Sequence, residues 1–235
     1  MMMTIPTALY GRTGAVLSAL IVVLCAVGLT LHSDVYAHVP RKHFYCYYTN
    51  LSNLLVLAYF GAVAPFLYMR KSSLIPTFEF SVTMAILLTH LVFHFMIYPA
   101  VKPMMGCAKL SGQTRMMAAD NLIIHYLVPW TTLLYWLLCA PGKQRIPGFA
   151  AMIWLVFPLV YAIAVLLRGR SGKNLAGTQH PYPYPFLDVQ ALGLTRVLRT
   201  CALLTLLGAL LSAAILWSIK LLFAVFGDGH DLFLI

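Results

Sequence analysis

Six long runs of apolar residues, nearly free of charge, follow one another along this chain of 235 residues. A helix rises about 1.5 Å per residue, so about 20 apolar residues are enough to cross the roughly 30 Å hydrocarbon core of a bilayer. The pattern therefore predicts an all-α, polytopic membrane protein in which residues 1–235 form one bundle of six transmembrane helices. The predicted spans lie at about 12–31, 48–69, 75–98, 119–139, 148–167 and 197–223.

Composition supports this fold class over a soluble one. Hydrophobic residues make up 61% of the chain and charged residues 9%, whereas soluble proteins have about 45–50% apolar and about 25% charged residues. The first run is also longer than the apolar core of a signal peptide, which has about 7–15 residues. We therefore expect an uncleaved first span, with a cleaved signal peptide ending near Val35-Tyr36-Ala37 as the alternative.

The formal net charge of +10 does not indicate a nucleic-acid partner, because the Lys and Arg residues lie in short loops rather than on one basic face. We expect them to contact anionic lipid at the membrane surface. Cytoplasmic termini are the working orientation, although the excess of basic residues on the other side favours the opposite one. Cytoplasmic termini would leave ten of the 16 Lys and Arg residues outside, with these inside: Arg12, Arg70, Lys71, Lys143, Arg145 and Lys220.

Polar residues gather at four places that the predicted topology brings to one face of the membrane. Polar groups inside spans are costly in hydrocarbon, which makes them functional candidates. Residues four apart lie on the same side of a helix, so each helical cluster presents its polar groups together. The clusters are Tyr48 and Thr49 with Asn53, Asp120 and Asn121 with His125, His90 with His94, and the segment from Tyr184 to Asp188.

Thr49 and His125 supply the minimum for nucleophilic catalysis. A threonine hydroxyl attacks a carbonyl only when a base takes its proton, and neutral imidazole is the usual base near pH 7. Thr49 begins its helix, where free backbone N–H groups could stabilise an oxyanion. We therefore expect the hydroxyl and a ring nitrogen of His125 to share one cavity, within direct or single-water hydrogen-bonding reach. Asp188, Asp120 or Asn121 could orient the imidazole, and Asn53 could support the site.

Structural roles are the alternative for these residues, since a membrane threonine often bonds to its own backbone and histidine often bonds between helices. His90 and His94 have the spacing of a metal pair, but their helix offers no third ligand. We predict no metal and no cofactor, and assign Tyr48, His90, His94 and Tyr184 to the substrate pocket. Prolines 181, 183 and 185 predict an extended, helix-free segment over 181–189.

Three motifs resemble one family. The run Tyr47-Tyr48-Thr49-Asn50-Leu51-Ser52-Asn53, then His125 followed by Pro129, then Tyr184-Pro185-Phe186-Leu187-Asp188 resemble bacterial six-span proteins related to the androgen-induced and androgen-dependent membrane hydrolases. The resemblance covers about residues 10 to 220. It implies a membrane hydrolase with Thr49 as nucleophile and His125 as its partner, acting on fatty acid esters of hydroxy fatty acids. It also implies the bacterial cytoplasmic (inner) membrane.

These observations predict a lipid ester hydrolase of the threonine type, with the bilayer and a lipid or fatty-acyl substrate as its partners. The alternative is a non-enzymatic membrane protein, either a carrier for small solutes or lipids or a structural subunit. Carriers commonly show repeat symmetry and polar groups near the membrane midplane. Here the polar groups lie toward one face, which favours a one-sided site.

Overall fold

The computed structural model describes residues 7–33, 43–65, 75–99, 119–140, 142–175 and 179–226, and all regular structure in these ranges is helical. The α-helices are α1 (Thr7–Ser33), α2 (Tyr48–Ala58), α4 (Ile75–Val92), α7 (Val128–Cys139), α8 (Ala150–Ile153), α9 (Val156–Gly169), α10 (Val189–Leu192) and α11 (Leu194–Phe226). The π-helical segments are η3 (Tyr59–Val63), η4 (Phe93–Ile97) and η5 (Ile123–Leu127). The 3-10 turns are η2 (Phe44–Cys46), η6 (Lys143–Arg145) and η7 (Pro185–Leu187).

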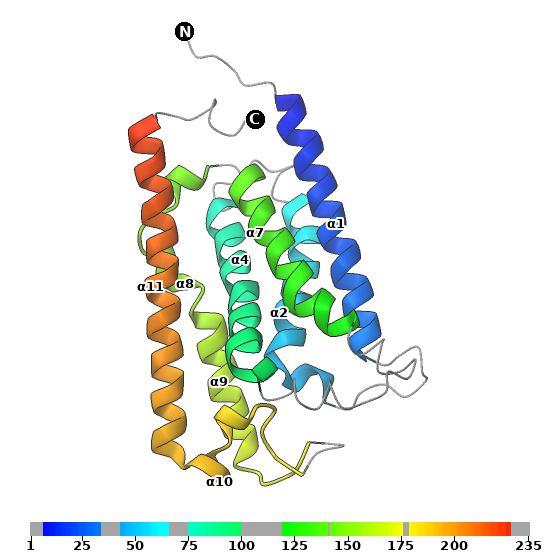
Figure 1. Cartoon of the computed structure of the whole chain (residues 1–235), viewed down its shortest axis with the longest axis vertical. Helices are drawn as coiled ribbons and strands as arrows, with labels where there is room; N and C mark the ends of the chain where they lie inside the picture. Colours follow the sequence, from blue (N-terminus) through cyan, green and yellow to red (C-terminus); the bar gives the residue numbers. More distant parts are fainter. Residues whose placement is uncertain are drawn as a thin grey trace.

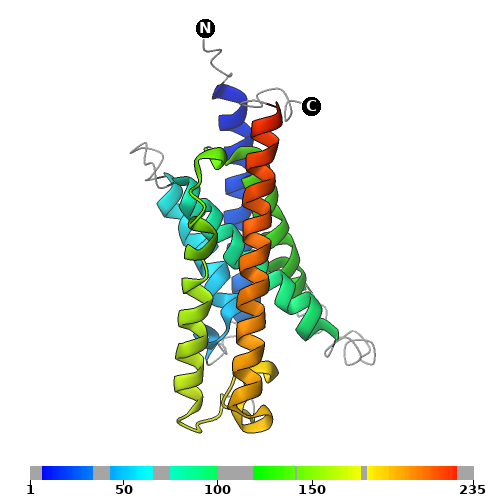
Figure 2. The same cartoon turned by 90° about the vertical axis from the view of Figure 1, so that its left-hand side faces the viewer.

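The long helices run along one common axis (Figure 1). Helices α1, α2, α4 and α7 pack against one another, and α11 packs against α8. Figure 2 shows α9 and α11 running side by side along the bundle. The beginning of α2, the end of η4 and η5 lie in the lower half of Figure 1, and α10 lies below them. This arrangement confirms that the predicted polar clusters meet at one end of the bundle.

Five helices in the described ranges are long and apolar enough to cross a membrane. They agree with five of the predicted spans to within a few residues. Proline 158 and the turn at Trp154 and Leu155 divide the fourth of them into α8 and α9, because proline lacks the N–H that the preceding turn needs. The five are Arg12–Ser33, Ile75–Ile97, Ala119–Cys139, Ala150–Gly169 and Leu194–Val225.

The helix that begins at Tyr48 is not among these five. Its first two turns carry Thr49, Asn50, Ser52 and Asn53, which lower its apolar character. All four side chains are buried inside the bundle. The last part of the predicted span, residues 66–69, lies outside the described residues.

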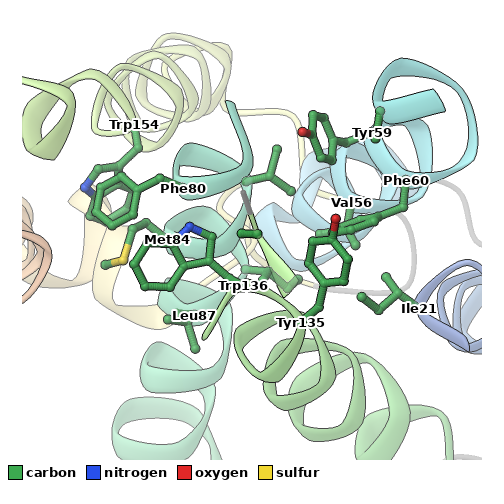
Figure 3. Close-up of a cluster of buried hydrophobic side chains, with 14 of the residues drawn as sticks. Ile21, Val56, Tyr59, Phe60, Phe80, Met84, Leu87, Tyr135, Trp136 and Trp154 are labelled. Atoms are coloured by element: carbon green, nitrogen blue, oxygen red, sulfur yellow. The ribbon is translucent and has the colours of Figure 1, made fainter. Parts of the chain in front are cut away.

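The interior of the bundle is an aromatic and aliphatic core (Figure 3). Phe60 of η3 meets Tyr135 of α7 edge to face with ring centroids 4.9 Å apart. The ring centroids of Phe80 on α4 and Trp136 on α7 lie 5.5 Å apart. Each such aromatic pair stabilises the fold by about 0.5–1.5 kcal/mol in addition to the contribution from its buried area. The core therefore fixes α2, which carries Thr49 and Asn53, α4, which carries His90, and α7, which follows the η5 turn of His125.

Large apolar side chains also cover the outer surface, most densely on α9 and α11. A water-soluble monomer rarely exposes a continuous apolar surface of this kind, which marks contact with membrane or protein. The bundle thus buries its polar clusters and exposes hydrocarbon. The exposed side chains include Val156, Val160, Ile163 and Leu167 on α9, and Leu203, Leu206, Leu207, Leu210 and Trp217 on α11.

The prediction of a helix-free segment over 181–189 is wrong in its second half. Residues 185–187 form the 3-10 turn η7 and α10 begins at Val189. Proline is tolerated in the first turn of a helix, where its missing N–H is not needed. Asp188 then caps α10, because its Oδ1 accepts hydrogen bonds from the N–H groups of Gln190 (2.9 Å) and Ala191 (3.0 Å).

Candidate active site

Thr49 and His125 face each other inside the lower end of the bundle. Thr49 lies in the first turn of α2, and His125 lies in the middle of η5. The hydroxyl oxygen of Thr49 and Nε2 of His125 are 3.3 Å apart, and only 7% and 4% of the two residues is exposed. The predicted hydrogen-bonding distance is therefore confirmed.

The surroundings of His125 determine which ring nitrogen carries the proton. Nδ1 lies 3.2 Å from the backbone carbonyl oxygen of Asn121. A carbonyl only accepts, so Nδ1 must donate, and the lone pair of neutral imidazole is then on Nε2. Phe93 stacks on the ring with centroids 3.7 Å apart and planes 19° apart. The imidazole is thus held in the tautomer and orientation that accept the proton of Thr49.

Pro129 explains the local geometry of η5. A proline has no N–H and clashes with the carbonyl four residues earlier, which here belongs to His125. In the π-helical turn the N–H of Val128 instead donates to the carbonyl of Ile123, five residues earlier. The same five-residue spacing would pair the carbonyl of Ile124 with Pro129, which has no N–H to donate. Two successive carbonyls, those of Ile124 and His125, therefore lose their usual backbone donors.

Side chains from two neighbouring helices donate to these carbonyls. Nδ2 of Asn53 on α2 lies 3.3 Å from the carbonyl oxygen of Ile124, and also 2.8 Å from that of Thr49. Nδ1 of His90 on α4 lies 2.8 Å from the carbonyl oxygen of His125. The turn that carries the imidazole is thus attached to both helices. Asn53 and His90 thus hold this turn in place, and their hydrogen bonds go to backbone carbonyls rather than to the Thr49 hydroxyl or the His125 ring.

The acidic residues expected to orient the imidazole, Asp120 and Asp188, form hydrogen bonds with other groups instead. Asp120 bonds Nδ1 of His32 at 3.0 Å and the N–H of Asn121 at 2.6 Å, which joins the end of α1 to the start of the helix that contains η5 and α7. Asp188 caps α10, and its Oδ2 lies 3.5 Å from Nδ1 of His180. The expectation of a carboxylate partner is therefore corrected. The backbone oxygen of Asn121, rather than its side chain, accepts from His125.

Tyr184 completes a chain of hydrogen bonds at Thr49. Its hydroxyl oxygen lies 3.3 Å from the Thr49 hydroxyl oxygen and 3.3 Å from the Thr49 nitrogen, whose N–H donates to it. The ring packs edge-on against Tyr47 and stacks on Phe186. Burial raises the pKa of the Tyr184 phenol, although its bonds to Thr49 oppose this effect. The sequence places Tyr184 in the pocket but does not predict its contact with Thr49.

An apolar cavity opens onto Thr49 and encloses about 710 Å³, part of it open to the outside. Tyr48, Thr49 and Tyr184 line this cavity but His125 does not, which corrects the expectation that Thr49 and His125 share one cavity. Most of the other lining side chains are apolar, although the hydroxyl-bearing Thr89, Tyr161 and Thr205 also line the cavity. The apolar lining includes Leu88, Val92, Leu155, Leu159, Ala162, Phe186 and Leu204.

His90 and His94 do not line this cavity, which corrects their assignment as pocket residues. The ring of His90 is turned toward the carbonyl of His125, and His94 bonds the hydroxyl of Tyr126 at 3.0 Å near the surface. Each Nδ1 is thus already hydrogen-bonded. Within the described ranges, no three His, Cys, Asp or Glu side chains converge as metal ligands would.

Comparisons with protein-family models, with curated proteins and with solved structures gave no significant match to this chain.

Proposed function

We propose that this chain is a six-span integral membrane protein that hydrolyses lipid esters, with Thr49 as nucleophile and His125 as general base. Five described helices are long and apolar enough to be spans. The helix that begins at Tyr48 would be the sixth, since its polar residues face the bundle interior rather than lipid. The exposed apolar surface of α9 and α11 suits hydrocarbon.

One observation carries the catalytic assignment. The Nδ1–H of His125 donates to a carbonyl, so its free Nε2 lone pair is directed at the only hydroxyl hydrogen that Thr49 has. The orientation of a base by a third group is the arrangement that activates a hydroxyl nucleophile.

The reaction follows from these positions. The proton of the Thr49 hydroxyl passes to Nε2 of His125 while the threonine oxygen forms a bond to the ester carbonyl carbon. The tetrahedral intermediate collapses, the bond to the alkoxide breaks, and the alkoxide takes the proton from His125. Water then attacks the acyl-threonine, with His125 as base and afterwards as acid, and releases the fatty acid.

The cavity supports an acyl chain as the part of the substrate that the protein binds. Most of its lining side chains are apolar, so a hydrocarbon chain would bury apolar surface there. The resemblance of the motifs at Thr49, His125 and Tyr184 to membrane hydrolases favours fatty acid esters of hydroxy fatty acids. That resemblance also favours the inner membrane of a bacterium as the location.

Covalent labelling tests this proposal. Purified protein in detergent is treated with a long-chain fluorophosphonate, and the modified residue is identified by mass spectrometry. We expect modification of Thr49 in the wild type, and none in Thr49→Ala or in folded His125→Asn protein. Thr200→Ala, which removes a partly exposed threonine on α11, is the matched control and should label normally. Labelling that is unchanged in Thr49→Ala would contradict the nucleophile assignment.

A further inference from the structure

The Tyr184 hydroxyl group lies closer to the reacting atoms than a packing role requires. It is within 3.3 Å of both the oxygen and the nitrogen of Thr49. Tyr184 also lines the cavity from which a substrate carbonyl would approach. The hydroxyl is therefore on the substrate side of Thr49, whereas His125 is not among the residues that line this cavity.

The directions of the hydrogen bonds follow from the donors available. The Thr49 hydroxyl gives its one hydrogen to Nε2 of His125, so its contact with Tyr184 must use the hydrogen of the phenol. The phenol oxygen in turn accepts the N–H of Thr49. A donor whose own oxygen accepts a hydrogen bond is polarised and becomes a stronger donor.

We infer that Tyr184 is a catalytic residue, and that its phenol O–H donates a hydrogen bond to the oxyanion formed when Thr49 attacks an ester carbonyl. The inference rests on the proposed function. When the threonine oxygen bonds to carbon, it becomes a poorer acceptor, and the carbonyl electron pair moves to an oxygen only two bonds away. The phenol hydrogen turns to that oxygen without leaving Tyr184. No proton is lost from the tyrosine at any step.

Two features suit Tyr184 to this role. Burial raises the pKa of its phenol, so the group keeps its hydrogen at neutral pH. The stack on Phe186, with centroids 5.3 Å apart and planes 7° apart, and the edge contact with Tyr47 fix the ring before substrate arrives. A donor that is already oriented toward developing charge costs no reorganisation during the reaction.

The substitution Tyr184→Phe tests the inference, because it retains the ring and removes only the hydroxyl. We expect kcat to fall by about 10²–10³, the usual effect of losing one oxyanion donor, with KM nearly unchanged. Tyr182→Phe is the matched control. Tyr182 is buried in the same segment but neither lines the cavity nor bonds Thr49, so this variant should turn over like the wild type.

A second measurement separates oxyanion binding from a structural effect. A long-chain trifluoromethyl ketone forms a tetrahedral adduct with a nucleophilic hydroxyl and so imitates the intermediate. Its inhibition constant should rise in Tyr184→Phe by the same factor by which kcat/KM falls. The affinity for a matching fatty amide, which stays planar, should not change. Equal affinity of the ketone for wild type and variant would overturn the inference.

The remaining outcomes are also decisive. Wild-type turnover in Tyr184→Phe, together with an inactive Thr49→Ala, would overturn this inference and leave the proposed function standing. A wild-type protein without esterase activity would overturn both. If Tyr184→Phe does not fold, 3-fluorotyrosine is placed at position 184 instead, because its hydroxyl is a stronger hydrogen-bond donor than that of tyrosine. Turnover within tenfold of wild type is expected, and a loss of 10² or more would overturn the donor role.

Discussion

Replacing Pro129 with alanine should separate stability from activity. Alanine has an N–H that can donate a hydrogen bond to the carbonyl of His125. This removes the local reason for the π-helical turn η5. Return to a regular α-helix would turn His125 relative to α7 by about 100°, the rotation per residue of a helix with 3.6 residues per turn. The imidazole would then leave Thr49, and Asn53 and His90 would lose their acceptors.

The magnitudes favour a stable but inactive protein. Proline in a helix interior costs about 3 kcal/mol relative to alanine. The two side-chain bonds to the carbonyls of Ile124 and His125 contribute about 0.6 kcal/mol each, the average for membrane proteins. The variant should therefore be more stable than the wild type by about 2 kcal/mol. Misplacement of a reacting group by about 1 Å lowers the rate by about 10²-fold, so ester turnover should fall at least that far.

Thermal unfolding in detergent and hydrolysis of a fatty acid ester measure the two effects on the same preparation. The double variant adds a control: His90→Phe should lower turnover in the wild-type background and change it little beside Pro129→Ala, because the acceptor of His90 is already lost. Folded Pro129→Ala protein with wild-type turnover would refute the account of η5. Additive losses in the double variant would do the same.

Two other predictions concern the opposite end of the bundle and the cavity. Burial lowers the pKa of Lys143 to about 8 from its ordinary value of 10.5, so the unfolded chain binds a proton that the folded chain has lost between these values. Stability should therefore rise as the pH increases from about 8 to 10.5, and Lys143→Met should flatten this rise in thermal unfolding curves. Ala162→Trp should fill the cavity beside α9 and lower kcat/KM for a long-chain ester relative to a short-chain ester by at least about 10-fold. Ile163→Trp, on the exposed face of the same helix, should leave that ratio unchanged, and a shift as large as that of Ala162→Trp would contradict the assignment of the cavity.

Five of the long helices and the contact between Thr49 and His125 were predictable from the sequence, because they depend on local pattern. Apolar runs of sufficient length set five helices to within a few residues. Topology alone then brings the start of α2 to the same end as η5, and Thr49 meets His125. The spacing of Pro129 four residues after His125 could also have predicted a freed carbonyl, since a proline always removes the donor at that distance.

The partners of the polar side chains were less predictable. Asp188 has the charge of a triad member, but its carboxylate is used by the first turn of α10. His125 uses a backbone oxygen instead, and backbone acceptors are present at every position, so sequence offers no signal for one of them. The contact of Tyr184 with Thr49 joins residues 135 positions apart. Such a contact depends on how the loop folds back over the bundle.

Turnover by three variants, Thr49→Ser, Thr49→Ala and His125→Asn, tests the central claim most directly. Serine keeps a hydroxyl at the same place and should retain measurable hydrolysis of a hydroxy fatty acid ester, with a loss from the freer rotamer. Alanine should reduce turnover to background. Asparagine can hydrogen-bond but cannot accept a proton near neutral pH, so activity should be lost while the fold survives. Full activity in well-folded Thr49→Ala protein would contradict the claim that Thr49 is the nucleophile.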